Sequence, residues 1–476
     1  MLFHTPTFAV FFFLFSACYF SSKNIAVRGF VLLVFSNIFY GWWDWRYLAL
    51  LWVTILVDYY VALALGSTEN AKKRKVFIAF SLLTNLGILG VFKYFNFFID
   101  SVEQVIGANV SNWYLHGLLL PVGLSFYTFQ SISYTVDVYR RKHEPIRSLL
   151  NYATFVCYFP QLVAGPIERA GHLLHQILNP AKPTRERISE GILLFCLGFF
   201  RKSVADTFAI MINPVFQNLS AATPAEVIFG IFGFGVQIYL DFAGYTDMAR
   251  GISRIMGIDL MINFKTPYLS SSPREFWRRW HISLSQWLRD YLYISLGGNR
   301  YGMPRHIRNL MITMMLGGLW HGAGLNFIIW GALHGIYLSI NTLIVRETTK
   351  NDKTHAIIGI LRSVSGWVVT FILVNYAWLY FRCSSFSDAM IANQKILFWL
   401  SDPHLPKIIP GAIILLTVII SIELISRIFE YRSYRKISYD SRTFGVAQGL
   451  ISGIFLVGGI ILLIGIPTQQ FIYFQF

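Results

Sequence analysis

The sequence has 476 residues, of which 55% are hydrophobic, 17% are aromatic and only 13% are charged. Soluble domains carry about a quarter charged residues, so this composition excludes an ordinary soluble globular protein. The net charge of +16 is typical of membrane proteins, which collect Lys and Arg in cytoplasmic loops and against anionic lipid. Nucleic acid is not an expected partner, because the sequence contains no soluble basic domain that would bind it.

Apolar segments follow one another along nearly the whole chain. The first begins almost at Met1 with no basic region before it, which favours a retained span over a cleaved signal peptide. Further segments lie at about 25–41, 47–65, 76–99, 113–137, 150–165, 187–210, 225–243, 309–342, 356–381, 409–427 and 446–466. Many approach the roughly 20 residues that cross a bilayer, where backbone groups must bond within helices. We therefore expect an all-α polytopic membrane protein with about ten to twelve transmembrane helices, in a single domain covering residues 1–476.

The loops between the first segments alternate in charge. Basic runs lie at 72–75 and 140–142, and the loop between them carries Asp100 and Glu103 without Lys or Arg. Because basic loops remain in the cytoplasm, this alternation places the N-terminus outside. Pro and Gly interrupt several segments, such as FPQLVAGPIER at 159–169, which favours re-entrant or tilted pieces over clean crossings.

The cysteines indicate neither a disulfide framework nor a metal centre. No CxxC pair and no Cys/His spacing typical of zinc sites occurs. All four lie in or beside apolar segments, at Cys18, Cys157, Cys196 and Cys383. We therefore expect no metal site.

Three polar stretches stand out, and the first is QIYLDFAGYTDMARG at 237–251. On a helix, Gln237, Asp241 and Tyr245 recur every four residues and share one face. That face is too polar for lipid, so it should point towards a cavity or another helix. Direct contact with a substrate and a hydrogen-bond network that ties helices together explain it equally well.

The second stretch is FWRRWHISLSQWLRDYLYISLGGNR at 276–300, which mixes tryptophans with arginines around His281. We expect a helix of this composition to lie in the membrane interface. Its arginines suit anionic lipids, and they also suit a polyanionic ligand, because the guanidinium fork pairs bidentately with phosphate. The candidate substrate-binding residues here are Arg278, Arg279, Trp280, Arg289, Asp290 and Asn299.

The third stretch, LGGLWHGAGLNFIIWGALHG at 316–335, carries His321 between Trp320 and Gly322. An ionisable group at membrane depth is costly, so it is a functional-site candidate by default. The alternative is a helix-packing stretch whose glycines allow close contact and whose histidine bonds a neighbouring carbonyl. His334 follows 13 residues later, about 220° around a continuous helix, so we rank it below His321, as a packing or supporting residue.

Together these stretches resemble the membrane-bound O-acyltransferase (MBOAT) family, in particular its bacterial branch. That branch includes the integral membrane subunits of alginate O-acetylation, peptidoglycan O-acetyltransferases and D-alanyl transfer proteins. The resemblance covers nearly the whole chain. The residues that carry it are FWRRWHISLS, RDYLYISLGGNR, GGLWHG, QIYLDFAGYTDMA, FPQLVAGPIER and the terminal FIYFQF.

The resemblance implies a fold whose helices enclose a central cavity, in the inner membrane of a bacterium. It implies acetyl-CoA as a cytoplasmic donor, with no further cofactor, and a hydroxyl of an extracytoplasmic polysaccharide or small carrier as acceptor. By the same resemblance His321 maps to the essential histidine and His281 to the second histidine of the site. It also implies an extracytoplasmic SGNH-type transferase as partner, since this chain lacks a sizeable soluble domain.

The residue chemistry fits this reaction. A hydroxyl is a poor nucleophile at neutral pH and needs a base within hydrogen-bond reach. Burial among Trp and Leu side chains would keep the His321 imidazole neutral and able to accept that proton. Charge that develops on the thioester oxygen needs positioned donors, and the candidates are Trp320, Asn326 and His281.

Two other functions compete with the enzyme. In a proton-coupled transporter or flippase, Asp241, Asp247 and His321 would serve as intramembrane titrating groups, although the sequence shows no internal two-fold repeat. In a polysaccharide synthesis complex, the chain would be a scaffold without chemistry of its own. Replacing His321 separates these functions, because only an enzyme loses turnover while keeping its fold.

Overall fold

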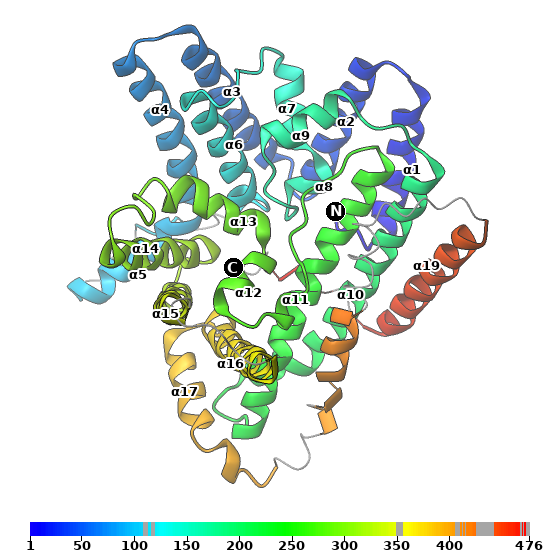
Figure 1. Ribbon diagram of the computed structural model, residues 1–476. Helices are drawn as coiled ribbons and strands as arrows, with labels where there is room; N and C mark the ends of the chain where they lie inside the picture. Colours follow the sequence, from blue (N-terminus) through cyan, green and yellow to red (C-terminus); the bar gives the residue numbers. More distant parts are fainter. Residues whose placement is uncertain are drawn as a thin grey trace. The chain divides into compact units, whose positions relative to one another are not determined.

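The computed structural model describes residues 1–107, 113–115, 120–348, 356–404, 410–411, 413–414, 416–424, 442–466, 469 and 471–472 (Figure 1). The regular elements of these residues are all helices, which confirms the expected all-α fold. The chain forms two compact units. Unit 1 contains Met1–Phe199, Tyr245–Met261 and Gln448–Gly453, and unit 2 contains Phe200–Gly244, Ile262–Ala447 and Ile454–Phe476. The expected single domain stays a prediction.

Unit 1 is built mainly from the first nine α-helices of the chain. They are α1 (Pro6–Ser21), α2 (Ile25–Gly41), α3 (Arg46–Ser67), α4 (Ala71–Leu89), α5 (Phe95–Ile106), α6 (Leu124–Tyr139), α7 (Leu149–Cys157), α8 (Phe159–Leu162) and α9 (Ala170–Leu178). A π-helical turn at Gly90–Tyr94 joins α4 to α5. Local signals set several starts: the Asn24 and Asn70 side chains accept the first free N–H groups of α2 and α4.

Buried polar contacts tie the helices of unit 1 together. The Asp58 carboxylate on α3 is fully buried and accepts hydrogen bonds from Ser81 Oγ (2.6 Å) and Asn85 Nδ2 (2.9 Å) on α4. A carboxylate inside an apolar unit is tolerated only when its oxygens are bonded in this way. The predicted interruption near Pro160 is confirmed, because α7 ends at Cys157 and the four-residue α8 begins at Phe159.

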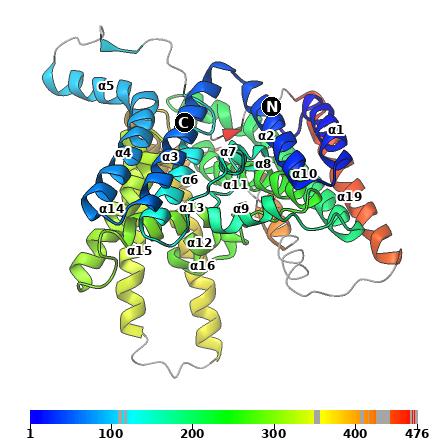
Figure 2. The same ribbon diagram turned by 90° about the horizontal axis from the view of Figure 1, so that it is seen from above.

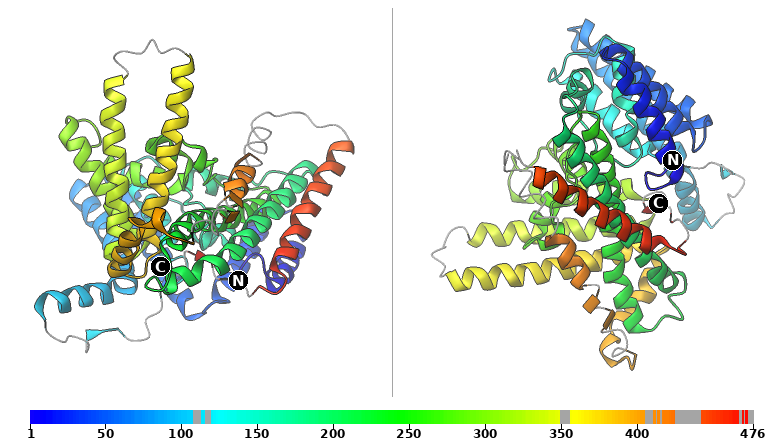
Figure 3. Two further views of the ribbon diagram at one scale, coloured as in Figure 1. Left: turned by 90° about the horizontal axis from the view of Figure 1, so that it is seen from below. Right: turned by 90° about the vertical axis from the view of Figure 1, so that its right-hand side faces the viewer.

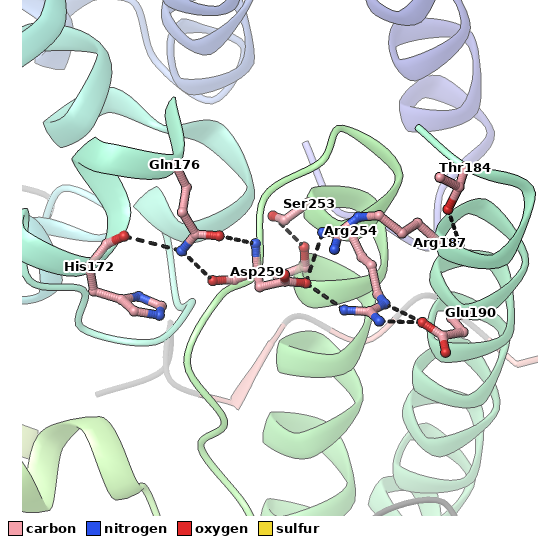
Figure 4. Close-up of polar contacts among 9 residues, drawn as sticks. His172, Gln176, Thr184, Arg187, Glu190, Ser253, Arg254 and Asp259 are labelled. Atoms are coloured by element: carbon pink, nitrogen blue, oxygen red, sulfur yellow. Dashed lines mark hydrogen bonds and ion pairs between the residues drawn. The ribbon is translucent and has the colours of Figure 1, made fainter. Parts of the chain in front are cut away.

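A second polar network of unit 1 surrounds Asp259 (Figure 4). Its carboxylate bonds Arg254 (2.5 Å) and Arg187 (3.0 Å), and its backbone N–H donates to Gln176 Oε1 (2.7 Å). Arg254 also pairs with Glu190 on α10 (Arg185–Gln217). These contacts hold the segment after α11 (Pro224–Ile255) against α9 and α10.

Five helices of the described residues are long and apolar enough to cross a membrane. They span Arg46–Ser67, Ala71–Glu103, Pro224–Ile255, Leu325–Ile344 and Gly359–Arg382, and shorter apolar helices cover Pro6–Ser21, Ile25–Gly41 and Gln448–Leu463. The chain is therefore a polytopic membrane protein. The larger number of crossings and the outside N-terminus stay predictions.

Unit 2 holds the helices that carry the histidine stretches. After parts of α10 and α11 come the 3₁₀ turn η3 (Pro267–Leu269), α12 (Pro273–Arg279), α13 (Ile282–Trp287), the π-helical η4 (Leu288–Tyr293), α14 (Met303–His321), α15 (Leu325–Thr348), α16 (Ala356–Arg382), α17 (Phe386–Ile396), the 3₁₀ turn η5 (Trp399–Ser401) and α19 (Arg442–Leu463). Both α10 and α11 contribute residues to each unit, and so does α19. Figures 2 and 3 show α15 and α16 as long neighbouring helices.

The apolar segment predicted at 309–342 is two helices. The helix α14 ends at His321, and α15 begins at Leu325 after a turn through Gly322 and Gly324. The two helices pack closely because they meet at glycines. A Cβ atom on Gly331 would meet the backbone of Met314, and one on Gly318 would meet the backbone carbonyl of Phe327. Small residues at such contacts are a common way to pack membrane helices.

The close approach of α14 and α15 predicts that Gly331→Ala is destabilising. The added methyl group meets backbone atoms, which cannot rotate away as a flexible side chain would. We expect a loss of about 1–3 kcal/mol in the free energy of unfolding, as in other overpacked interiors. Thermal unfolding of the detergent-solubilised protein, followed by tryptophan fluorescence, measures it.

Gly87→Ala near the end of α4 is the matched control, because outside the neighbouring backbone of its own helix no atom lies within 4 Å of a Cβ at that position. Alanine is the better helix former, so this variant should be unchanged or gain about 0.5–1 kcal/mol. Equal stability of the two variants would contradict the inferred contact.

Candidate active site

His281 lies at the junction of α12 and α13, where the backbone leaves the helical path. Its φ angle is +41°, a left-handed conformation that few residues other than glycine adopt. Asn263 fixes this turn, because its carbonyl oxygen accepts from Ile282 N (2.9 Å) and its side chain accepts from Ser283 Oγ (2.6 Å). A strained residue held by its neighbours is a feature of functional sites.

The His281 imidazole faces an aromatic interior. Its side chain is fully buried, with the Phe242 ring centroid at 4.7 Å and that of Trp320 at 6.4 Å. Burial lowers the pKa of His281 to about 3, so this imidazole is neutral at physiological pH.

The expected interfacial helix at 276–300 is not present as one element. The chain forms α12, α13 and the π-helical η4 instead, because the turn at Trp280 and His281 interrupts the first helix. Trp277, Trp280 and Trp287 are buried in the protein, whereas an interfacial helix would present them to lipid headgroups. The tryptophan content alone did not distinguish an interface from an interior.

The arginines of this stretch are placed differently from one another. Arg278 and Arg289 are exposed, and Arg289 pairs with the neighbouring Asp290 (2.7 Å). Arg279 pairs with Glu275 (2.6 Å) within α12. Asn299, in the loop before α14, is exposed. Their expected contacts with substrate stay predictions.

His321 is the last residue of α14, and side chains of three helices surround it. Its ring centroid lies 4.8 Å from Trp320 on α14, 5.1 Å from Trp330 on α15 and 5.3 Å from Phe381 on α16. The side chain is buried, as expected. Since Trp320 contacts both His321 and His281, the structure brings the two predicted histidines to one indole ring.

His334 is closer to this group than the sequence suggested. The ranking below His321 assumed one continuous helix, but α14 ends at His321, so the angle between the two positions has no meaning. Trp330 contacts both His321 (5.1 Å) and His334 (4.8 Å). Trp277 Nε1 donates to His334 Nδ1 (3.3 Å). The four-residue spacing of Asn326, Trp330 and His334 would have revealed this face of α15.

Asn326 and Asp241 already have partners. The Asn326 amide nitrogen donates to the Cys383 carbonyl oxygen (3.0 Å) at the end of α16. The Asp241 carboxylate pairs with Lys202 Nζ (2.9 Å) and accepts from Ile472 N (2.7 Å), and Lys202 also pairs with Asp206 (2.6 Å). These contacts favour the network interpretation for Asp241.

The helical face predicted for 237–251 is confirmed by α11, but its residues divide between the units. Gln237 and Asp241 are buried in unit 2, whereas Tyr245 is buried in unit 1 and stacks on Phe3 (4.7 Å). Asp247, also in unit 1, pairs with Arg250 (3.1 Å). Across the part of the chain that the structure describes, no group of three His, Cys, Asp or Glu side chains could hold a metal ion.

Lys202 is a buried cation that the sequence did not single out, and it predicts a strong effect on stability. Lys202→Met leaves the carboxylates of Asp206 and Asp241 buried without their cation. Such a loss costs about 3–5 kcal/mol. We expect a large drop in the unfolding temperature, measured as for the glycine variants.

Asp241→Asn is the comparison, because Lys202 keeps Asp206 and the asparagine oxygen still accepts from Ile472 N. The unfolding temperature of Asp241→Asn should fall less than that of Lys202→Met. The reverse order would show that Lys202 does not neutralise this cluster.

Comparison with known proteins places these residues in a family context. The sequence model of the membrane-bound O-acyltransferase family matches residues 37–386. This range includes His281, His321 and His334. The chain is 43% identical to the probable alginate O-acetylase AlgI of Pseudomonas syringae over 358 residues, which cover 75% of this chain and 67% of that protein.

Two further relatives are more distant. The chain is 35% identical to the peptidoglycan O-acetyltransferase of Helicobacter pylori, with 78% of this chain and 73% of that protein covered. It is 31% identical to the teichoic acid D-alanyltransferase of Bacillus subtilis, with 47% and 59% covered. All three names describe enzymes that transfer an acyl group.

Proposed function

The chain belongs to the membrane-bound O-acyltransferase family, and from this premise we propose that it moves an acetyl group from cytoplasmic acetyl-CoA across the membrane for O-acetylation of an extracytoplasmic polysaccharide, with a hydroxyl of the polymer or of a small carrier as acceptor. Relatives named for alginate and peptidoglycan O-acetylation support a polysaccharide acceptor. The proposed location is the inner membrane of a bacterium, with the N-terminus outside and the basic loops in the cytoplasm.

The observation that carries the proposal is the burial of His321 among aromatic rings at the end of α14. In the proposed reaction its imidazole accepts the proton of the acceptor hydroxyl, whose oxygen forms a bond to the acetyl carbon. The carbon–sulfur bond of the thioester breaks, and the departing thiolate takes the proton from the imidazolium. The products are an O-acetyl ester and the free thiol of CoA.

In this reaction, hydrogen-bond donors near His321 stabilise the negative charge that develops on the thioester oxygen. Such donors act best when they are positioned beforehand in a site that excludes water. The buried His281 is neutral and can donate, and Trp320 adjoins both histidines. The Asn326 nitrogen already donates to Cys383, so we assign this role to His281 and Trp320.

The exposed arginines Arg278 and Arg289 suit the phosphates of acetyl-CoA and the headgroups of anionic lipids. Guanidinium groups bind phosphate through paired hydrogen bonds. The donor would place its phosphates at this basic surface and extend its thin pantetheine arm towards His321. Acetyl-CoA is then a co-substrate, and the proposal needs no further cofactor.

Replacing His321 tests the proposed base. We expect His321→Ala to lower the turnover of radiolabelled acetyl-CoA by the purified protein in lipid about 10²–10⁴-fold, the contribution typical of a positioned general base. The measurement is the release of labelled acetate or acetyl ester per protein molecule. His404→Ala is the control, because it removes an exposed imidazole of unit 2 and should keep full turnover.

The outcomes separate the competing functions. Equal turnover of wild type and a well-folded His321→Ala variant would remove His321 from the chemistry. A wild-type protein that consumes no acetyl-CoA, even with its partner present, would favour the transporter or the scaffold over the enzyme.

We propose that an extracytoplasmic SGNH-type transferase completes the reaction by passing the acetyl group to the polymer. Removal of this partner should abolish acetylation of the polymer but leave binding of acetyl-CoA to the membrane protein unchanged. Polymer acetylation is measured by ester content, and donor binding is measured by calorimetry on the purified protein in lipid. Loss of donor binding together with polymer acetylation would contradict this division of labour.

A further inference from the structure

One face of α15 carries three buried polar atoms without a protein partner among the described residues. Asn326, Trp330 and His334 recur every four residues, so their side chains share this face. Each side chain is at most 4% exposed. The atoms are Asn326 Oδ1, Trp330 Nε1 and His334 Nε2. A buried polar atom without a bond is costly, so three on one face point to a ligand with matching groups.

The hydrogen bond from Trp277 sets the chemistry of His334. Trp277 Nε1 can only donate, so His334 Nδ1 accepts and carries no proton. A neutral imidazole in that state holds its proton on Nε2. His334 therefore presents an N–H donor, and Trp330 presents a second through its indole. The face of α15 offers two donors and one acceptor.

The contacts of Trp330 place this face beside His321. His334 contacts Trp330, which in turn contacts His321. The ring centroids of His321 and Trp330 lie 5.1 Å apart, and those of Trp330 and His334 lie 4.8 Å apart. Both imidazoles therefore adjoin the same indole ring, and a ligand bound along it can meet His321 with one part and His334 with another. Successive members of the face are about 6 Å apart along the helix.

We propose that Asn326, Trp330 and His334 hold the amide-bearing arm of the thioester donor, with His334 Nε2 donating to an amide carbonyl oxygen of that arm. The inference rests on the proposed acetyl transfer. An extended pantetheine arm carries its first amide one short chain beyond the thioester, so a thioester at His321 would bring that amide to the neighbouring residues of this face. Its amides offer carbonyl oxygens to the two N–H donors and an N–H to Asn326.

In this inference His334 contributes to the selection of the thioester substrate. Two matched substitutions separate this role from a role in packing. His334→Asn keeps a polar group near the position of Nδ1, where it can accept from Trp277, and removes the donor at Nε2. His334→Gln keeps an amide N–H near the position of Nε2 and gives up the contact with Trp277. Thermal unfolding of both variants reports the structural cost of each change.

Two small thioesters measure the contact with the amide. Acetyl-S-N-acetylcysteamine contains the amide next to the thioester, and S-pentyl thioacetate has the same thioester without an amide. We expect wild type and His334→Gln to prefer the amide-bearing donor in kcat/KM by about tenfold, the effect of one hydrogen bond that is otherwise left unmade. In His334→Asn the preference should fall to about one. Trp330→Phe, which keeps the ring but lacks the N–H, should reduce it too.

Other results would overturn the inference. A wild-type protein without preference for the amide, or His334→Asn with the wild-type preference, would show that His334 Nε2 serves a buried water molecule or packing only. If His334→Asn fails to fold, the same comparison in Trp330→Phe decides. If the wild type turns over acetyl-CoA and these variants leave the preference for the amide-bearing thioester unchanged, only the contact with the pantetheine arm is refuted. If the wild type shows no turnover of acetyl-CoA, the proposed function itself is refuted.

Discussion

The close packing of α14 against α15 is the contact on which the geometry of the candidate site depends. Gly318 and Gly331 allow the two backbones to meet, and the short turn through Gly322 and Gly324 reverses the chain directly after His321. This reversal brings Trp330 of α15 against the imidazole at the end of α14. A larger residue at the contact would separate the helices and so move the aromatic wall away from His321. The glycines that explain helix packing therefore also build the site, and the two interpretations of this stretch do not compete.

A second constraint is the cost of burying polar groups in a membrane protein, and unit 2 meets it in two ways. Lys202 pairs with the carboxylates of both Asp206 and Asp241 within hydrogen-bond distance, and the backbone of Ile472 donates to the carboxylate of Asp241. This cluster is nearly complete in itself, which suits a structural role. The histidines instead lie among aromatic rings that offer few acceptors, and burial favours their neutral form. The contrast separates buried groups that hold the fold from buried groups that are suited to proton transfer or hydrogen bonding with a substrate.

The sequence predicted the long apolar helices well because hydropathy over some twenty residues needs no tertiary information. The expected span at 356–381 corresponds to α16, and that at 25–41 corresponds to α2. The turn at 322–324 was missed because a glycine-rich run within an apolar segment is equally typical of close helix packing. The burial of Trp277 and Trp280 was missed for a similar reason, since tryptophan suits both an interface and an interior. Lys202 was not singled out although its partner Asp206 follows four residues later on α10, because the second partner, Asp241, comes from α11.

The arrangement of rings suggests why one apolar interior contains three imidazoles. His281, Trp320, His321, Trp330 and His334 follow one another in ring contact, so each pair of successive histidines shares an indole neighbour. All three imidazoles are at most 4% exposed, and burial of this kind opposes the charged form. If His321 is the proposed base, burial favours protonation only together with a substrate that carries the compensating charge. If the proposed thioester donor binds here, such a restriction would slow hydrolysis of the acyl group relative to its transfer to the acceptor.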